Sequence, residues 1–141
     1  MDVIMKKTFI LMFIFFLGLV VGCGKSDKVK EKEMVSIVSN IETAFNAKNV
    51  KGVMENFDAQ FKDDKGNDFI KVFKMLEEEF SSDEPGRVSL TAEDISVGAD
   101  LGKSPVTVRA VFYKGDEETI YIFRTDFIDN KGEWKVLRAS W

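Results

Sequence analysis

The stretch FNAKNVKGVMENFDAQF, from Phe45 to Phe61, contains the boundaries of three predicted elements. A helix predicted over residues 31–47 ends here, and Asn49 is a residue type that caps the start of a helix. A short second helix is predicted because apolar residues recur at helical spacing at Val50, Val53, Met54 and Phe57. The polar stretch after it has room for a short strand around residues 60–62. This one segment therefore predicts the order helix, helix, strand.

Helical periodicity continues on both sides of this segment. The first helix carries one apolar stripe, formed by Met34, Val38, Ile41 and Phe45. After the segment, Asn67 or Asp68 is suited to cap a third helix. Its stripe comprises Phe69, Val72, Phe73, Leu76 and Phe80. SSDEPG then ends this helix.

The rest of the chain has the period of two that is typical of strands. Residues 88–97 predict one long bent strand or two short ones. Residues 106–113, 119–128 and 133–141 are rich in β-branched and aromatic residues, with KGDE and DNKG as hairpin turns between them. Helices followed by an antiparallel meander predict an α+β fold, in which the N-terminal helices pack on a curved antiparallel sheet.

Apolar residues occupy both faces of this predicted sheet. In the middle hairpin strand, Ile120 and Ile122 alternate with Tyr121, Phe123 and Phe127. In the last strand, Trp134 and Val136 alternate with Leu137, Ala139 and Trp141. The helices can cover only one face. The other face either reflects strand propensity alone or predicts a homodimer through the sheet.

The N-terminus has the parts of a secretory signal. Lys6 and Lys7 precede an apolar run over residues 9–21, which is shorter than the about 20 residues that a transmembrane helix needs. Val20-Val21-Gly22-Cys23 resembles the lipobox of bacterial lipoproteins. The resemblance implies a signal peptide over residues 1–22, a diacylglyceryl group on Cys23 and a lipidated tether over residues 23–30.

Two other readings of this segment stay open: an uncleaved membrane anchor, and an ordinary cleaved signal that leaves a free thiol. Under the lipoprotein reading the chain is exported and attached to a membrane through its lipid. Because Gly24 and not Asp follows the cysteine, the resemblance implies the outer membrane in a bacterium with two membranes.

Composition excludes several function classes. The chain has 20 Lys and Arg against 24 Asp and Glu, a balance that argues against nucleic acid as a partner. It has no histidine. That absence removes Ser-His-Asp and Cys-His catalysis and most zinc and iron sites, so we expect no metal and no cofactor.

Residues 31–141 resemble a known superfamily. The Phe45–Phe61 segment and the closing GEWKVLRASW are similar to patterns of the nuclear transport factor 2-like superfamily, a cone-shaped α+β fold shared with ketosteroid isomerase, scytalone dehydratase and polyketide cyclases. The resemblance implies a domain over residues 31–141 with a pocket at the wide end of the cone. It also implies dimerisation through the sheet in many members.

The resemblance suggests candidates for catalysis. An isomerase-like site pairs a carboxylate base with a hydroxyl group that stabilises an enolate. The candidates are Asp58, Asp126 and Tyr121, with Tyr113 as a second hydroxyl. Tyr121 and Asp126 have opposite strand parity and should face opposite sides of the sheet. Asp58 also suits a turn or a helix cap.

Three arginines are candidates for binding. Arg109, Arg124 and Arg138 fall on neighbouring predicted strands. They either converge on an anionic ligand or form cross-strand ion pairs. The leading prediction is a lipoprotein of the bacterial cell envelope that binds a protein partner or a small apolar ligand without catalysis. The alternative is a small pocket enzyme of the isomerase or dehydratase type.

Overall fold

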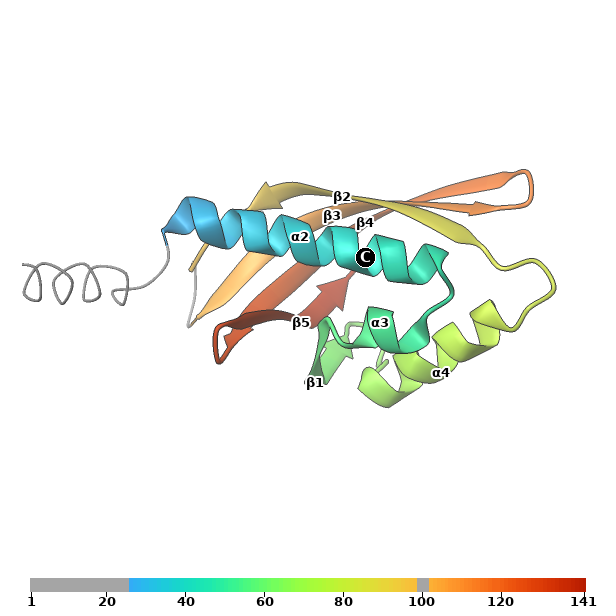
Figure 1. Cartoon of the computed structure of the whole chain (residues 1–141), viewed down its shortest axis with the longest axis horizontal. Coiled ribbons are helices and arrows are strands. Elements are labelled where there is room, and N and C mark those ends of the chain that lie inside the picture. The colour runs from blue at the N-terminus through green and yellow to red at the C-terminus, as the bar shows by residue number, and fades with distance from the viewer. Residues whose placement is uncertain (1–25, 99–101) are drawn as a thin grey trace, which may run out of the picture. The chain divides into compact units, whose positions relative to one another are not determined.

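The computed structural model describes residues 26–98 and 102–141. Cys23 and the apolar run before it lie outside the described residues, so the lipobox stays a prediction. The elements follow in the order α2 (Asp27–Asn46), α3 (Val50–Met54), β1 (Phe57–Asp63), α4 (Phe69–Phe80), β2 (Arg87–Ile95), β3 (Lys103–Lys114), β4 (Glu117–Asn130) and β5 (Glu133–Ser140) (Figure 1). This order confirms the predicted α+β fold. Within the described ranges, no helix combines the length and apolar character that a membrane span requires.

Two of the predicted helix caps are confirmed. The side chain of Asn49 accepts a hydrogen bond from the Gly52 amide at 3.0 Å. Of the two candidates for the third helix, Asp68 is the cap, accepting from the Lys71 amide at 2.9 Å. Side-chain acceptors at these positions satisfy amides that have no partner inside the helix.

Two boundaries differ from the predictions. Helix α2 begins at Asp27, four residues before the predicted start at residue 31. Ser26 explains the earlier start, since its carbonyl accepts from the Lys30 amide at 3.1 Å and its hydroxyl lies 3.4 Å from the Val29 amide. The end of the predicted tether is thus helical. Phe57 belongs to β1 and not to the second helix, and β1 is longer than predicted.

The five strands form one sheet in the order β1-β5-β4-β3-β2. The meander β2 to β5 is antiparallel as predicted. Strand β1 adds to it as a parallel neighbour of β5, a pairing that the sequence did not predict. Residues 87–95 form one bent strand with a bulge at Glu93, because Ala92 pairs with Val108 and Asp94 with Thr107.

A second bulge corrects the predicted faces of the last strand. Asp126 pairs with Arg138 and Phe127 pairs with Val136, so Leu137 is an extra residue in β5. An extra residue reverses the alternation of side chains beyond it. Ala139 therefore lies on the same face as Val136 and packs against the core. The prediction that Ala139 and Trp141 oppose Trp134 and Val136 was wrong.

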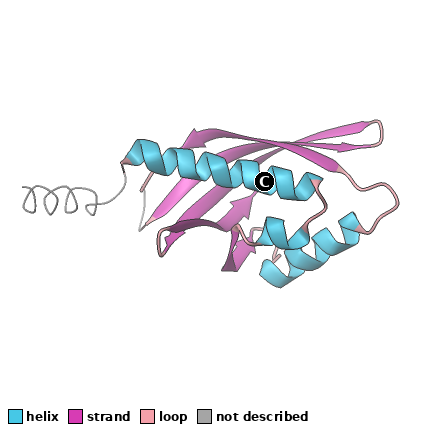
Figure 2. Cartoon of the chain, viewed as in Figure 1, coloured by secondary structure: helices cyan, strands magenta, loops and turns pink. Residues whose placement is uncertain are grey.

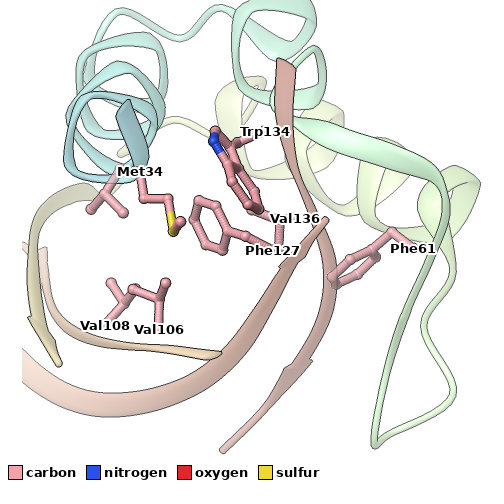
Figure 3. Packing of buried hydrophobic residues seen from close by; sticks show 8 residues of the cluster. Met34, Phe61, Val106, Val108, Phe127, Trp134 and Val136 are labelled. Atoms are coloured by element: carbon pink, nitrogen blue, oxygen red, sulfur yellow. The ribbon is translucent and has the colours of Figure 1, made fainter. Parts of the chain in front are cut away.

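The helices cover one face of the sheet (Figure 2). The core lies between the helices and this face. Figure 3 shows Met34 of α2 beside Phe127 and above Val106, with the strands curving around this cluster. These three side chains are 0%, 1% and 1% exposed. We call this covered face the inner face. On the outer face, Ile120 and Ile122 are 51% and 46% exposed.

The C-terminal end of helix α2 is also bonded to the free edge of β2. Three side chains at or just beyond this end bond to alternate backbone positions: Glu42 to Leu90, Asn46 to Val88 and Lys48 to Gly86. Asn46 makes two of these bonds, donating to the Val88 carbonyl and accepting from the Val88 amide, both at 2.9 Å. The side chains occupy the place of a neighbouring strand and close an edge that would otherwise be open.

We expect Asn46→Ala to lower the free energy of unfolding by about 1–3 kcal/mol, because both backbone groups of Val88 lose their partner. Denaturant unfolding measures the change. The matched control is Asn40→Ala on the same helix, since Asn40 is exposed and makes no side-chain hydrogen bond to the described residues. Equal stability of the two variants would contradict the role given to the edge bonds.

Candidate functional site

An apolar cavity of about 300 Å³ lies between the helices and the inner face of the sheet. Its size falls at the lower end of the about 300–1,000 Å³ that is usual for small-molecule pockets. Side chains from α2, α4 and the strands line it, among them Val38, Ile41, Phe45, Val72, Leu76, Val108, Phe112, Phe123, Val136 and Ala139. We call this space the cone cavity.

The polar side chains at the cone cavity are already hydrogen-bonded. Apart from the indole of Trp141 they are Asp63, Asn67 and Thr125. Thr125 donates its hydroxyl to the Val106 carbonyl at 2.7 Å. The Asp63 carboxylate accepts from the Asn67 side chain at 2.6 Å and from the Asn67 amide at 2.8 Å. None of the three is thus left as an unengaged base or proton donor.

The hydrogen bonds at Asp63 also set its protonation. Burial by itself would raise the pKa of this carboxyl group. The hydrogen bonds from Asn67 and from the Lys65 amide outweigh burial, so the pKa of Asp63 lies below its ordinary value. Asp63 is therefore a charged carboxylate that holds the loop 63–67, and it is not a proton donor at neutral pH.

Aromatic side chains form a continuous row beside the cone cavity. Ring centroids are 5.9 Å apart for Phe45 and Phe112, 5.6 Å for Phe112 and Tyr121, 5.9 Å for Tyr121 and Phe123, and 5.2 Å for Phe123 and Trp141. Tyr121 is 38% exposed and Trp141 is 40% exposed. The row therefore begins in the core at Phe45 and ends at the surface, where it forms the mouth of the cavity.

Helix α4 covers the cavity with side chains that are only half-buried. Its stripe faces the interior as predicted, but none of its residues is fully buried. Its C-terminal end is held by Glu79, which accepts from the Gly86 amide at 2.9 Å and from Lys114 Nζ at 3.2 Å. The hydrogen bond from the Gly86 amide holds the pKa of Glu79 below its ordinary value, and Lys114 lowers this pKa further. Burial of the carboxyl group acts in the opposite direction and is outweighed.

The catalytic candidates from the sequence do not come together. Asp58 lies at the start of β1, where its carboxylate accepts from the Gln60 amide at 2.9 Å, and it is not a residue of the cavity wall. Asp126 lies on the outer face opposite Arg138. Tyr121 lies at the mouth, and Tyr113 on the outer face is 38% exposed. No carboxylate of this set shares the cavity with a tyrosine hydroxyl.

The arginine candidates are partly brought together. Arg124 and Arg138 line one hollow of about 420 Å³ on the outer face, and Lys62 of β1 joins them. We call it the basic hollow. Arg109 lies on the same face, between Thr91 and Ile122, and does not line the hollow. The described residues contain no group of three or more acidic or thiol side chains suited to a metal ion.

Lys62 was missed by the sequence reading. Its place beside Arg138 depends on the parallel pairing of β1 with β5, and a parallel pair leaves no hairpin signal in the sequence. The cone cavity was expected only through the resemblance. Alternating apolar residues do not distinguish a wall of a cavity from a filled core.

No family model and no curated protein matches the sequence. The fold does match solved structures. An NTF-2 like protein of unknown function from Shewanella oneidensis MR-1 aligns with a TM-score of 0.68 at 13% identity, covering 79% of this chain and 97% of its own. A protein of unknown function with a cystatin-like fold from Nostoc punctiforme aligns with a TM-score of 0.62 at 6% identity, covering 83% and 92%.

A third match carries an enzyme name. A putative scytalone dehydratase from Novosphingobium aromaticivorans aligns with a TM-score of 0.60 at 13% identity, covering 81% of this chain and 83% of its own. Identities this low show the fold alone. The chain therefore has the nuclear transport factor 2-like, cystatin-like cone fold, with an apolar cavity inside it.

Proposed function

We propose that this chain is a lipid-anchored protein of the bacterial cell envelope whose domain binds an apolar small molecule without chemical change. The observation that carries the proposal is the cone cavity, whose walls are almost entirely apolar and whose polar side chains Asp63, Asn67 and Thr125 are already engaged. A ligand between such walls is stabilised by burial of its apolar surface, at about 25 cal/mol per Å². The walls provide no free acid or base for catalysis.

The exposed row of aromatic rings supports the same proposal. Tyr121, Trp141 and Met75 are 38%, 40% and 49% exposed around the mouth. Apolar side chains grouped at the entrance of a concave site are typical of binding surfaces. An apolar ligand in the cavity would cover them and remove them from water.

A pocket enzyme of the isomerase or dehydratase type is the alternative. It requires a carboxylate and a proton donor at one apolar site. Asp58 and Asp126 lie away from the cavity, and Asp63 is held as a charged hydrogen-bond acceptor. The residue geometry therefore favours binding, and the dehydratase name of one fold neighbour is a fold-level analogy.

The anchoring part of the proposal rests on Val20 to Cys23 and the basic, apolar segment before it. Each buried methylene of an attached acyl chain contributes about 0.8 kcal/mol, so two or more chains keep a domain at a bilayer. Acylation also removes the only thiol of the chain, and the domain then needs no disulfide.

Val108→Phe should reduce binding of the neutral probe N-phenyl-1-naphthylamine by about tenfold or more, because Val108 is 7% exposed and lines the cavity. Fluorescence titration of residues 26–141 measures the effect. Val111→Phe is the matched control, since Val111 lies on the same strand but pairs with Ile120 on the outer face. A probe affinity that changes equally in both variants would argue against the cavity as the binding site.

Cys23→Ala should leave the signal segment uncut and the chain without diacylglycerol, because the sulfur is the acceptor of the lipid. Intact mass spectrometry of protein from a bacterial host, together with detergent phase partition, measures both properties. A variant with the same mature mass and partition as the parent chain would disprove the anchor while leaving the ligand proposal intact.

We also propose that two copies associate through the exposed apolar residues of the outer face. The Leu137 bulge moves Ala139 and Trp141 to the inner face, so the interface narrows to Ile120, Ile122 and Tyr113. Ile122→Glu should convert a dimer to a monomer in sedimentation velocity. Val35→Glu, which alters a 48% exposed residue of α2, should not. A parent chain that is monomeric at every concentration would end this proposal.

A further inference from the structure

All four arginines of the chain lie on the outer face of the sheet. Arg87 pairs with Tyr113, Arg109 with Ile122, Arg124 with Thr107 and Arg138 with Asp126, and each of these positions alternates with a residue of the inner face. All four are exposed. Within residues 26–98 and 102–141, none of them forms an ion pair or a side-chain hydrogen bond.

Cations are adjacent at the basic hollow. Lys62 is the direct neighbour of Arg138 on the paired strands β1 and β5. Arg124 is one diagonal step away, because it pairs with Ser140 while Arg138 pairs with Asp126. Like charges that are direct neighbours on one face of a sheet destabilise it. This repulsion would be relieved by an anion between the three side chains.

No ion pair joins the nearby carboxylates to these cations within the described residues. Asp63 is occupied by its hydrogen bonds from the loop 63–67. Asp126 is the cross-strand partner of Arg138, yet no ion pair joins the two side chains. Asp64 also lines the hollow and makes no ion pair to the described part of the chain. The hollow thus contains unpaired cations although the protein as a whole is acidic.

We propose that the basic hollow binds a phosphate group, as a second site separate from the cone cavity. Two guanidinium groups suit a tetrahedral oxyanion because each offers two parallel N–H donors, and Lys62 adds a third positive charge. Thr107 and Ser140 also line this hollow. The phosphate belongs either to a soluble phosphate ester or to a phospholipid headgroup.

Arginine side-chain NMR tests the site directly. The chain has four arginines, so its ¹⁵N–¹H spectrum contains four Nε–Hε signals, each assigned by its loss in a single Arg→Lys variant. Inorganic phosphate added to the full chain in neutral detergent micelles should shift the signals of Arg124 and Arg138 with saturation. Arg87, at the far end of the face beside Tyr113, is the internal control. Equal shifts of all four signals in phosphate and in sodium chloride of the same ionic strength would overturn the proposal.

Two variants separate binding from folding. Arg124→Ala should weaken phosphate binding by about tenfold or more, since charge-assisted hydrogen bonds are lost. Asp126→Asn should instead tighten it several-fold, because it removes a negative charge beside Arg138, and damage to the fold would not produce that gain. An unchanged affinity in Asp126→Asn, or a loss in an Arg87→Ala control equal to that in Arg124→Ala, would contradict the site.

A last comparison distinguishes the two sources of the phosphate. Soluble glycerol phosphate and micelles doped with phosphatidylglycerol are titrated separately against the Arg124 and Arg138 signals. Saturation with the soluble ester identifies a soluble ligand, and saturation only with the doped micelles identifies a headgroup. If neither ligand shifts the Arg124 and Arg138 signals selectively, the phosphate site is overturned. The proposal for the cone cavity is unaffected by that result.

Discussion

The fold depends on how α2 is fixed along the free edge of β2. Glu42, Asn46 and Lys48 bond to backbone groups at Leu90, Val88 and Gly86, which a neighbouring strand would otherwise pair. Burial alone would let a helix slide along a sheet, because the hydrophobic effect is not directional. These bonds set both the position and the rotation of α2. They place Met34 and Val38 over the inner face, and Phe45 at the start of the aromatic row.

Local chemistry made most of the fold predictable. Asn49 and Asp68 are caps whose role depends only on the next few residues, and hairpin turns join strands that are consecutive. The wrong predictions concern features that depend on residues distant in the sequence. The parallel pairing of β1 depends on the whole topology, and the Leu137 bulge depends on the match between β4 and β5. Ser26 is the exception, since its capping role was visible in the sequence and was missed.

The candidate sites were less predictable than the fold. Strand parity alone assigns Tyr121 and Asp126 to opposite faces of the sheet. This assignment is confirmed, since Tyr121 lies at the mouth of the cavity and Asp126 lines the basic hollow. Grouping the arginines required the register of the strands. Arg124 and Arg138 share a hollow, whereas Arg109 lies two residue pairs further along β3 than the partner of Arg124. The cone cavity could be located only from the three-dimensional packing of the helices on the sheet. Several of its wall residues, among them Val108, Phe127 and Val136, also belong to the buried core, so the periodicity of the sequence does not separate the cavity wall from the packed core.

Helices α2 and α4 are attached unequally. Helix α2 has Met34, Val38 and Phe45 in the core and is bonded to the sheet edge at its C-terminal end, whereas α4 has no fully buried residue. Helix α4 is joined to the rest of the fold by Glu79, which accepts from Gly86 and Lys114, and by a stripe of half-buried apolar side chains that packs against the core. The apolar side chains of α4 therefore pack against the core without being fully buried, and the cone cavity lies beside them. A packed core would be more stable, so an unfilled space at this position costs stability that burial of a ligand would restore.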